Sequence, residues 1–173
     1  MTEVRSSPTA HEQLAAIASL STVLDERAID FWLFGGWAVD FWVGTITRQH
    51  DDIDVVAWRG DYDAIEAALD AVGWRHIRSP EDVVGTRYML GSAEVEFTFV
   101  EPDSEGAIVV PIPGHPVVWT NEPFGNERRE LLGVTTRTIP LALLKNGKSL
   151  PRESDVEGSK DRADFQALAQ IDS

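Results

Sequence analysis

The sequence predicts a mixed α/β fold of the α+β type, in which helices pack on a mixed sheet. Two observations support this fold class. Short apolar strands alternate with helical patterns in the first half of the chain, and several strand-like segments then follow one another directly. The 173 residues are 43% apolar, which suffices for one hydrophobic core. We expect a single domain over residues 9–173, after a flexible polar start at residues 1–8.

The first half of the chain predicts three helices and two strands. A helical period begins near Thr9. Its apolar face comprises Leu14, Ile17, Ala18, Leu24 and Ala28. The aromatic run 31–34 is typical of a buried strand, and residues 37–43 indicate a short helix that a glycine closes. Residues 53–58 predict the next strand, and a helix follows from Asp61. The inward stripe of that helix comprises Ile65, Ala68, Leu69 and Val72.

The second half predicts a run of strands and two late helices. Strands are expected at 74–79, 86–90 and 93–100. The last alternates, with Val95, Phe97 and Phe99 on one face and Glu94, Glu96 and Thr98 on the other. The proline-rich segment 101–124 can hold only short edge strands, at 108–110 and 117–120. The remaining expectations are a strand at 131–139, a helix from Pro140 through Lys145, a polar loop at 151–158, and a helix capped by Ser159 with Phe165, Leu168 and Ala169 inward.

The charge balance restricts the partners of the chain. Lys and Arg total 15 and Asp and Glu total 29, which gives a net charge of −14. Binding to nucleic acid is disfavoured, because such proteins neutralise phosphates with basic residues. An acidic surface suits a cationic small molecule, although solubility alone explains it equally well. There is no cysteine, which excludes disulfides and thiol chemistry, and no long uncharged apolar run, so we expect a cytoplasmic protein without a membrane span.

A pair of glycines, Gly35 and Gly36, ends the aromatic strand and opens the following helix. Glycines allow backbone N–H groups to approach a ligand closely, and a helix N-terminus favours phosphate. The alternative is a tight strand–helix turn without a ligand, since the spacing matches neither the Rossmann nor the P-loop pattern.

Acidic residues cluster at the start of the strand 53–58. Asp52 and Asp54 point to the same face because strand side chains alternate, whereas Asp51 is out of phase. Carboxylates crowded in this way remain ionised at low cost when a cation lies between them, and oxygen ligands suit Mg²⁺. Glu94 and Glu96 are two candidates for a third carboxylate. The alternative is a solvated strand end and a solvent-facing sheet.

The run Trp32-Leu33-Phe34-Gly35-Gly36-Trp37-Ala38-Val39-Asp40 is followed by Thr47-Arg48-Gln49-His50-Asp51-Asp52-Ile53-Asp54. This combination resembles the aminoglycoside 2″-nucleotidyltransferases and the lincosamide nucleotidyltransferases, which belong to the polymerase-β-like nucleotidyltransferase superfamily. The resemblance is close over residues 31–58 and looser over 86–100. It recurs weakly at Lys160-Asp161-Arg162-Ala163-Asp164, which is similar to a Lys-Asp-x-x-Asp element of related enzymes.

The resemblance implies a nucleotidyltransferase fold and a role for each matching residue. Gly35 and Gly36 would hold the triphosphate of a nucleoside triphosphate, with Arg48 as a helper and Lys160 as a further candidate. Asp52 and Asp54 would bind Mg²⁺ in a two-metal site. The third acid is Asp in these relatives and falls on Glu96 here, a departure that leaves Glu94 as an alternative. Glu96 would bind metal and act as the base.

The implied reaction moves a nucleoside monophosphate, from ATP or another triphosphate, to a hydroxyl of a small cationic acceptor such as an aminoglycoside or lincosamide. Pyrophosphate leaves. Two other functions remain open: a toxin-type enzyme acting on tRNA or protein, and a catalytically silent nucleotide-binding module. A structure tests the silent module, because carboxylates too far apart to share metal ions would exclude catalysis. A homodimer is also left open.

Four further residues have both a functional and a structural interpretation. Lys145 and Lys148 could pair with phosphate oxygens, or be ordinary solvated residues at a helix end. Trp119 could stack on a base or a substrate ring, or belong to the core. His50 lies close to the acids in sequence, where such a histidine commonly hydrogen-bonds the turn.

Overall fold

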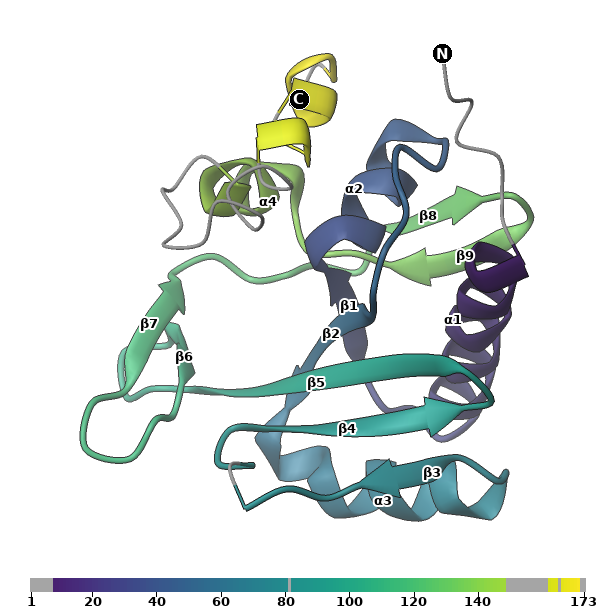
Figure 1. Ribbon diagram of the computed structural model, residues 1–173. Coiled ribbons are helices and arrows are strands. Elements are labelled where there is room, and N and C mark those ends of the chain that lie inside the picture. The colour runs from purple at the N-terminus through teal and green to yellow at the C-terminus, as the bar shows by residue number, and fades with distance from the viewer. Residues whose placement is uncertain (1–7, 81, 149–161, 165, 172–173) are drawn as a thin grey trace.

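The core of the protein is a mixed sheet with helices packed on it (Figure 1). The computed structural model describes residues 8–80, 82–148, 162–164 and 166–171. Across the sheet the strands follow the order β1 (Phe31–Phe34), β2 (Ile53–Trp58), β5 (Ala93–Pro102), β4 (Gly85–Leu90) and β3 (Arg75–Ile77). The pair of β2 and β5 is parallel and the other pairs in this order are antiparallel. The α+β fold class is therefore confirmed.

The proline-rich segment forms a projecting hairpin beyond the end of β5 (Figure 1). Its strands are β6 (Ile108–Val110) and β7 (Val117–Thr120), at the residues that the sequence predicts. β6 pairs with the end of β5, and β7 pairs with β6. Proline lacks a backbone N–H, so the segment supports only short strands at the edge of the sheet.

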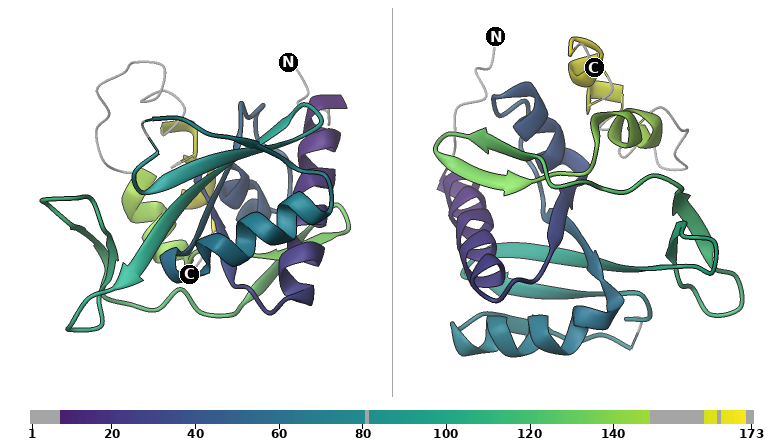
Figure 2. Two further views of the ribbon diagram at one scale, coloured as in Figure 1. Left: turned by 90° about the horizontal axis from the view of Figure 1, so that it is seen from below. Right: turned by 180° about the vertical axis from the view of Figure 1, so that it is seen from behind.

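Two helices cover the apolar face of the sheet. They are α1 (Pro8–Glu26) and α3 (Tyr62–Ala71), which follows the short 3₁₀ turn η1 (Arg59–Asp61). The two helices contact each other, and α1 also packs on β5 (Figure 2). The inward side chains of β5 are buried as predicted, and the ring of Phe99 lies 5.1 Å from that of Tyr62 on α3. The opposite face of β5 carries its polar side chains.

Three local predictions in this region need correction. Ala28 does not extend the apolar face of α1, because the helix ends at Glu26 and Ala28 lies in a turn with φ of 55°. Val72 is 47% exposed and not part of the inward stripe of α3, since it already belongs to the turn that ends the helix. The predicted strand at 74–79 is shorter, because only Arg75–Ile77 pairs with β4.

Helix α2 (Gly35–Val43) begins directly after β1, two residues earlier than predicted. It ends where Gly44 adopts the left-handed conformation with φ of 91°, as the sequence indicates. Its N-cap residue, Phe34, provides no side-chain hydrogen bond to the first turn. The side chain at the N-cap position therefore does not satisfy the backbone N–H groups of that turn.

The prediction of one strand at 131–139 is wrong. A hairpin replaces it, formed by β8 (Arg128–Leu131) and β9 (Val134–Arg137). Leu132 and Gly133 form the two-residue turn, with φ of 49° and 84°. Two successive positive φ values match the twist of the flanking strands. The usual residues of such turns are asparagine and glycine, so Leu132 gave no turn signal.

The last described segments lie beside α2. Helix α4 (Leu141–Lys148) follows Pro140 as predicted, and contacts α2. Residues 162–164 and 166–169 are helical, and Leu168 is buried as expected. Ala169 is exposed, so its predicted inward position is wrong. Residues 1–7 of the predicted start 1–8 lie outside the described residues, as do the loop 151–158, Ser159 and Phe165. Pro8, the last residue of that predicted start, already belongs to α1.

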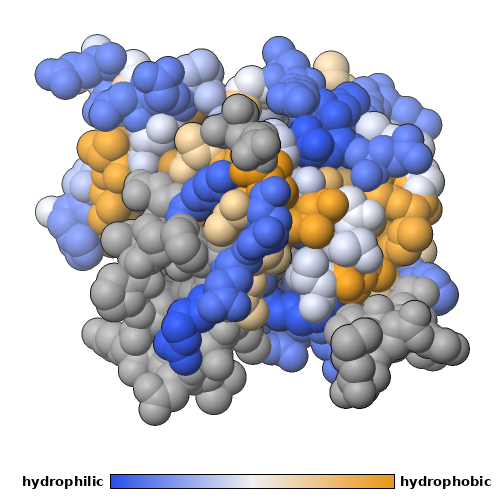
Figure 3. Space-filling model, turned by 90° about the horizontal axis from the view of Figure 1, so that it is seen from above, coloured by the Kyte–Doolittle hydropathy of each residue, from blue (hydrophilic) through white to orange (hydrophobic). Residues whose placement is uncertain are grey.

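Among the described helices, none combines the length and the hydropathy that crossing a membrane requires. The face on which α2 and α4 lie shows several separate apolar patches among hydrophilic residues (Figure 3).

Leu69 of α3 and Val72, in the turn that ends this helix, test the packing of α3 against the sheet. Leu69→Ala should lower the free energy of unfolding by about 2–5 kcal/mol, because Leu69 is fully buried and the truncation leaves a cavity. Val72→Ala removes an exposed side chain three residues away and should change stability by less than about 0.5 kcal/mol. Urea unfolding measures both, and equal effects would contradict this packing.

Candidate active site

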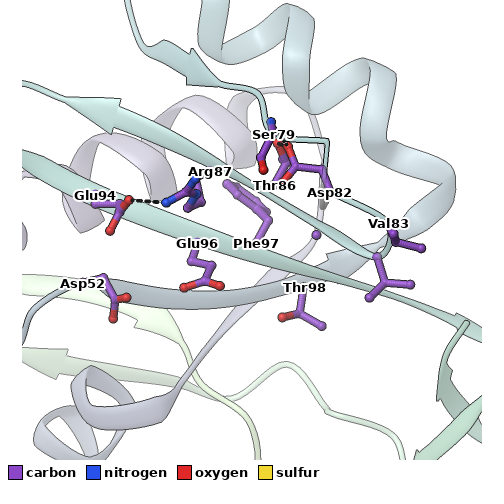
Figure 4. Close-up of a pocket in the computed structure, with 12 residues that line it drawn as sticks. Asp52, Ser79, Asp82, Val83, Thr86, Arg87, Glu94, Glu96, Phe97 and Thr98 are labelled. Carbon is purple, nitrogen blue, oxygen red and sulfur yellow. Dashed lines mark hydrogen bonds and ion pairs between the residues drawn. The ribbon is translucent and has the colours of Figure 1, made fainter. Parts of the chain in front are cut away.

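Three carboxylates meet where β2 begins, on the polar face of the sheet. The parallel register places Asp54 of β2 directly opposite Glu96 of β5. Asp52 precedes β2 by one residue and lies on the same side. One carboxylate oxygen of each residue lies within 4.8 Å of those of the other two. In Figure 4 the carboxylates of Asp52 and Glu96 point into the same space.

Like charges at this spacing repel one another, and this repulsion contributes to a shift in the pKa of Glu96. Burial raises the pKa of the Glu96 carboxyl, and the negative charges of Asp52 and Glu94 raise it further, while Arg87 acts in the opposite direction. A hydrogen bond with Asp52 also favours the protonated form. Glu96 thus binds a proton more readily than an isolated glutamate.

Glu96, rather than Glu94, joins the two aspartates among the described residues. Glu94 lies two residues earlier on the same strand, and its carboxylate is 3.4 Å from the guanidinium of Arg87 on β4 (Figure 4). The strand register explains the difference, because Glu96 and not Glu94 stands opposite Asp54.

The two glycines at the start of α2 lie against this cluster. Gly35 has φ of 67°, and a Cβ atom there would lie 2.5 Å from Oδ2 of Asp54. Glycine is therefore required at this position by both conformation and space. The end of β1 brings it there, since Phe34 pairs with Asp54 across the two strands.

Gly36 is enclosed by two side chains of the segment that leads to β2. A Cβ atom at this position would lie 2.5 Å from Nδ1 of His50 and 2.6 Å from Nη2 of Arg48. The pair of glycines thus permits close packing of the segment before β2 over the first turn of α2.

A buried polar network fixes His50. Its Nε2 lies 2.5 Å from Oδ2 of Asp40, a fully buried residue of α2. The other oxygen of Asp40 accepts hydrogen bonds from the backbone N–H and the hydroxyl of Thr47. Gln13 of α1 donates to the carbonyl of His50 and accepts from the indole of Trp37. His50 therefore forms a hydrogen bond with Asp40 of helix α2, and not only with residues of its own turn.

Arg48 has a buried partner that the sequence did not reveal. Its Nε and Nη2 atoms donate to the two carboxylate oxygens of Asp164, at 2.9 and 3.0 Å. Asp164 is 1% exposed and lies in the helical residues 162–164. Burial alone would lower the pKa of Arg48, but the hydrogen bond and charge of Asp164 outweigh it and raise the pKa. Arg48 is thus held as a cation beside α2.

A cavity of about 490 Å³ adjoins the carboxylates (Figure 4). It extends along the polar face of β5 and β4 to the loop before β4. Its charged lining residues are Asp52, Asp82, Glu94, Glu96 and Arg87. Four acids against one base give this cavity a negative charge, which suits a cationic ligand.

The other candidates named from the sequence have more ordinary surroundings. Lys145 donates a hydrogen bond to the carbonyl of Ile171. Trp119 is half-buried, with its ring edge-on to Phe34 at 5.3 Å. The side chain of Lys148 and all of Lys160 lie outside the described residues, so their roles remain predictions.

The donor set fits magnesium. Asp52, Asp54 and Glu96 offer hard oxygen ligands, which Mg²⁺ prefers, and they are close enough to share ions with phosphate oxygens. A divalent cation between them would offset the repulsion that raises the pKa of Glu96.

Comparison with solved structures identifies the fold class. The lincomycin-bound lincosamide adenylyltransferase LnuA matches with a TM-score of 0.70, at 18% identity over 93% of this chain and 97% of that one. ANT(2″)-Ia in complex with adenylyl-2″-tobramycin gives 0.64, at 18% identity over 92% and 88%. The protein therefore has the nucleotidyltransferase fold.

Sequence comparison then identifies the family. The family model described as aminoglycoside-2″-adenylyltransferase matches residues 16–150, and the chain belongs to this family. Curated 2″-aminoglycoside nucleotidyltransferases from Escherichia coli and Klebsiella pneumoniae are 36% identical over 63 residues. That segment is 36% of this chain and 36% of each relative.

Two alanine substitutions test the close packing at α2. Gly36→Ala should destabilise the protein by about 1–3 kcal/mol, because Asp40 and Asp164 hold the side chains that its methyl group would meet. Gly60→Ala is the matched control, since nothing lies within 4 Å of a Cβ there, and should shift stability by no more than about 0.5 kcal/mol. Thermal unfolding compares them, and an unchanged Gly36→Ala protein would contradict the enclosure.

Carboxylate crowding predicts that Glu96→Gln stabilises the metal-free protein. The pKa of Glu96 is raised from its ordinary value of 4.5, so folding favours the protonated form. Wild-type stability from this group is complete below that value and is lost as pH rises through the raised pKa. In EDTA, the variant should melt roughly 1–2 °C higher than wild type at pH 8, since exposure weakens the effect. The two should converge at pH 4, and a lower melting temperature for the variant at pH 8 would contradict the crowding.

Proposed function

We propose that this protein transfers a nucleoside monophosphate from a nucleoside triphosphate to a hydroxyl group of a small cationic acceptor. One observation carries the proposal: Asp52, Asp54 and Glu96 converge within 4.8 Å beside the glycine pair that opens α2. A silent module would not need three carboxylates held together against their own repulsion. Family membership supports the same chemistry.

Each part of the site has a role in this reaction. Asp52, Asp54 and Glu96 would hold Mg²⁺, as a two-metal site, and the N–H groups of the first turn of α2 would receive phosphate oxygens. When bound, Mg²⁺ offsets negative charge on the phosphoryl oxygens and on the departing pyrophosphate. The neighbouring cation, Arg48, adds positive charge on the same side.

Glu96 is proposed to act as the general base. Its carboxylate accepts the proton of the acceptor hydroxyl while that oxygen attacks the α-phosphorus in line. The bond from the α-phosphorus to the bridging oxygen breaks, and pyrophosphate leaves with the electron pair. The Glu96 side chain is one methylene group longer than the aspartate of the relatives, and its position opposite Asp54 supports this role.

The acceptor class follows from charge and from the family. The cavity beside Glu96 carries four acidic residues against one arginine, and the whole chain has a net charge of −14. Aminoglycosides are polycations and lincosamides carry a basic amine, so the charge of either class is complementary to this cavity. An enzyme that modifies tRNA needs basic residues to neutralise phosphates, and a net charge of −14 disfavours that alternative.

The decisive assay is pyrophosphate release that depends on magnesium and on an acceptor. ATP, GTP, CTP and UTP would each be tested with a panel of aminoglycosides and lincosamides. We expect release with at least one pair and a loss of roughly 10²–10⁴-fold in kcat for Asp54→Asn. Glu127→Gln, the same carboxylate-to-amide change at a residue whose side chain is 72% exposed, should retain wild-type activity.

Two results would count against the proposal. Undiminished turnover of Asp54→Asn would place the chemistry elsewhere. Absence of release with every pair, from protein that binds magnesium nucleotide, would favour a silent module.

A further inference from the structure

The guanidinium of Arg48 uses two of its edges within the described structure. Its side edge, Nε and Nη2, donates to both oxygens of Asp164. Nη1 donates to the backbone carbonyl of Gln49 at 3.0 Å. A guanidinium has five N–H groups, so these three contacts leave two, one on each terminal nitrogen. Within the described part of the chain, no partner is recorded for them.

The remaining N–H group of Nη2 lies on the end edge of the guanidinium, between its two terminal nitrogens, and this edge is a fork that matches two oxygens of a phosphate. The guanidinium also lies over the first turn of α2, because a Cβ atom on Gly36 would come within 2.6 Å of Nη2. The side chain is 21% exposed, so a ligand can reach it. An anion at the N-terminus of α2 would therefore meet both the helix N–H groups and this edge.

We propose that Asp164 is a positioning residue for the triphosphate. Its carboxylate fixes the plane of Arg48 by occupying the side edge, so that the end edge is presented to a phosphate group at the start of α2. This inference rests on the proposed function and adds to it a residue outside the segment 16–150 that matches the family model. Asp164 itself touches no substrate in this assignment and acts through Arg48.

The geometry explains why a carboxylate suits this task. A flexible arginine loses rotamer freedom when it binds phosphate, and a partner that already holds its side edge removes part of that cost. The partner is 1% exposed and lies in the helical segment 162–164, so water competes little for its carboxylate. An asparagine could accept only one of the two hydrogen bonds and would carry no charge.

The test uses the intact protein and inorganic tripolyphosphate with magnesium, because this probe has neither a base nor a reacting acceptor. Calorimetry would give its Kd for wild type, Asp164→Asn, Asp164→Glu, Arg48→Lys and the double variant Arg48→Lys/Asp164→Asn. Asp30→Asn is the matched control, since it removes an aspartate from another arginine pair, with Arg137, at the opposite end of β1.

We expect Asp164→Asn and Arg48→Lys each to raise the Kd about tenfold. The double variant should bind no more weakly than either single variant, because Asp164 acts only through the end edge of Arg48, which Arg48→Lys already removes. Asp164→Glu keeps the charge and should restore part of the affinity, and Asp30→Asn should bind as wild type does. In kinetics with nucleotide, the KM for nucleotide should rise more than kcat falls, with the KM for the acceptor unchanged.

Three outcomes would overturn the inference. Equal or tighter binding by Asp164→Asn would mean that this carboxylate competes with phosphate. An effect of about a hundredfold in the double variant would mean that Asp164 and Arg48 act independently. Equal losses in kcat and both KM values, without rescue by Asp164→Glu, would mean that Asp164 only holds the fold.

The design separates this inference from the proposed function. If Asp164→Asn does not fold, the comparison of Asp164→Glu with Arg48→Lys decides, and unchanged binding by both would overturn the inference. Tripolyphosphate binding that depends on both residues, without transfer to any acceptor, would support the inference while contradicting the proposed function. Nucleotidyl transfer that does not depend on Asp164 would support the proposed function and contradict the inference about Asp164.

Discussion

The parallel pairing of β2 with β5 is the constraint on which the site depends. It sets Asp54 opposite Glu96, and neighbouring strands lie only about 4.8 Å apart, so two negative charges are forced together. The sheet can hold this arrangement because the other face of β5 is buried under α1 and α3. A slip of one residue would turn Glu96 into the core and Phe97 out of it. Apolar packing on one face thus fixes the register of charges on the other.

A second constraint fixes the glycine turn relative to the carboxylates. Asp40 on α2 accepts hydrogen bonds from both Thr47 and His50, so the segment between α2 and β2 is tied to the helix that it leaves. His50 in turn covers Gly36, where only a hydrogen atom fits. The N-terminus of α2 and the strand that carries the carboxylates are therefore tied together, as the proposed binding of phosphate and cation at one site requires.

The sequence allowed the strands and the carboxylates to be predicted, because alternation within a strand is a local property. Asp52 and Asp54 share a face by spacing alone. The choice between Glu94 and Glu96 needed the strand register, which is set by long-range packing. The pairing of Arg48 with Asp164 joins residues 116 positions apart, and no local pattern reports it. The hairpin turn at Leu132 was missed because tertiary structure imposed a conformation that this residue type seldom adopts.

The bond between Arg48 and Asp164 also bears on the order in which the molecule is assembled. A ribosome adds roughly 5–20 residues per second, so the 116 positions that separate the two residues take roughly 6–23 s to synthesise. During that interval β2 and β5 are synthesised while Arg48 still lacks its acidic partner. The carboxylate cluster can form early, whereas this ion pair can form only late in synthesis. In a nascent chain, the strands of the sheet can therefore pair before Arg48 forms its ion pair with Asp164.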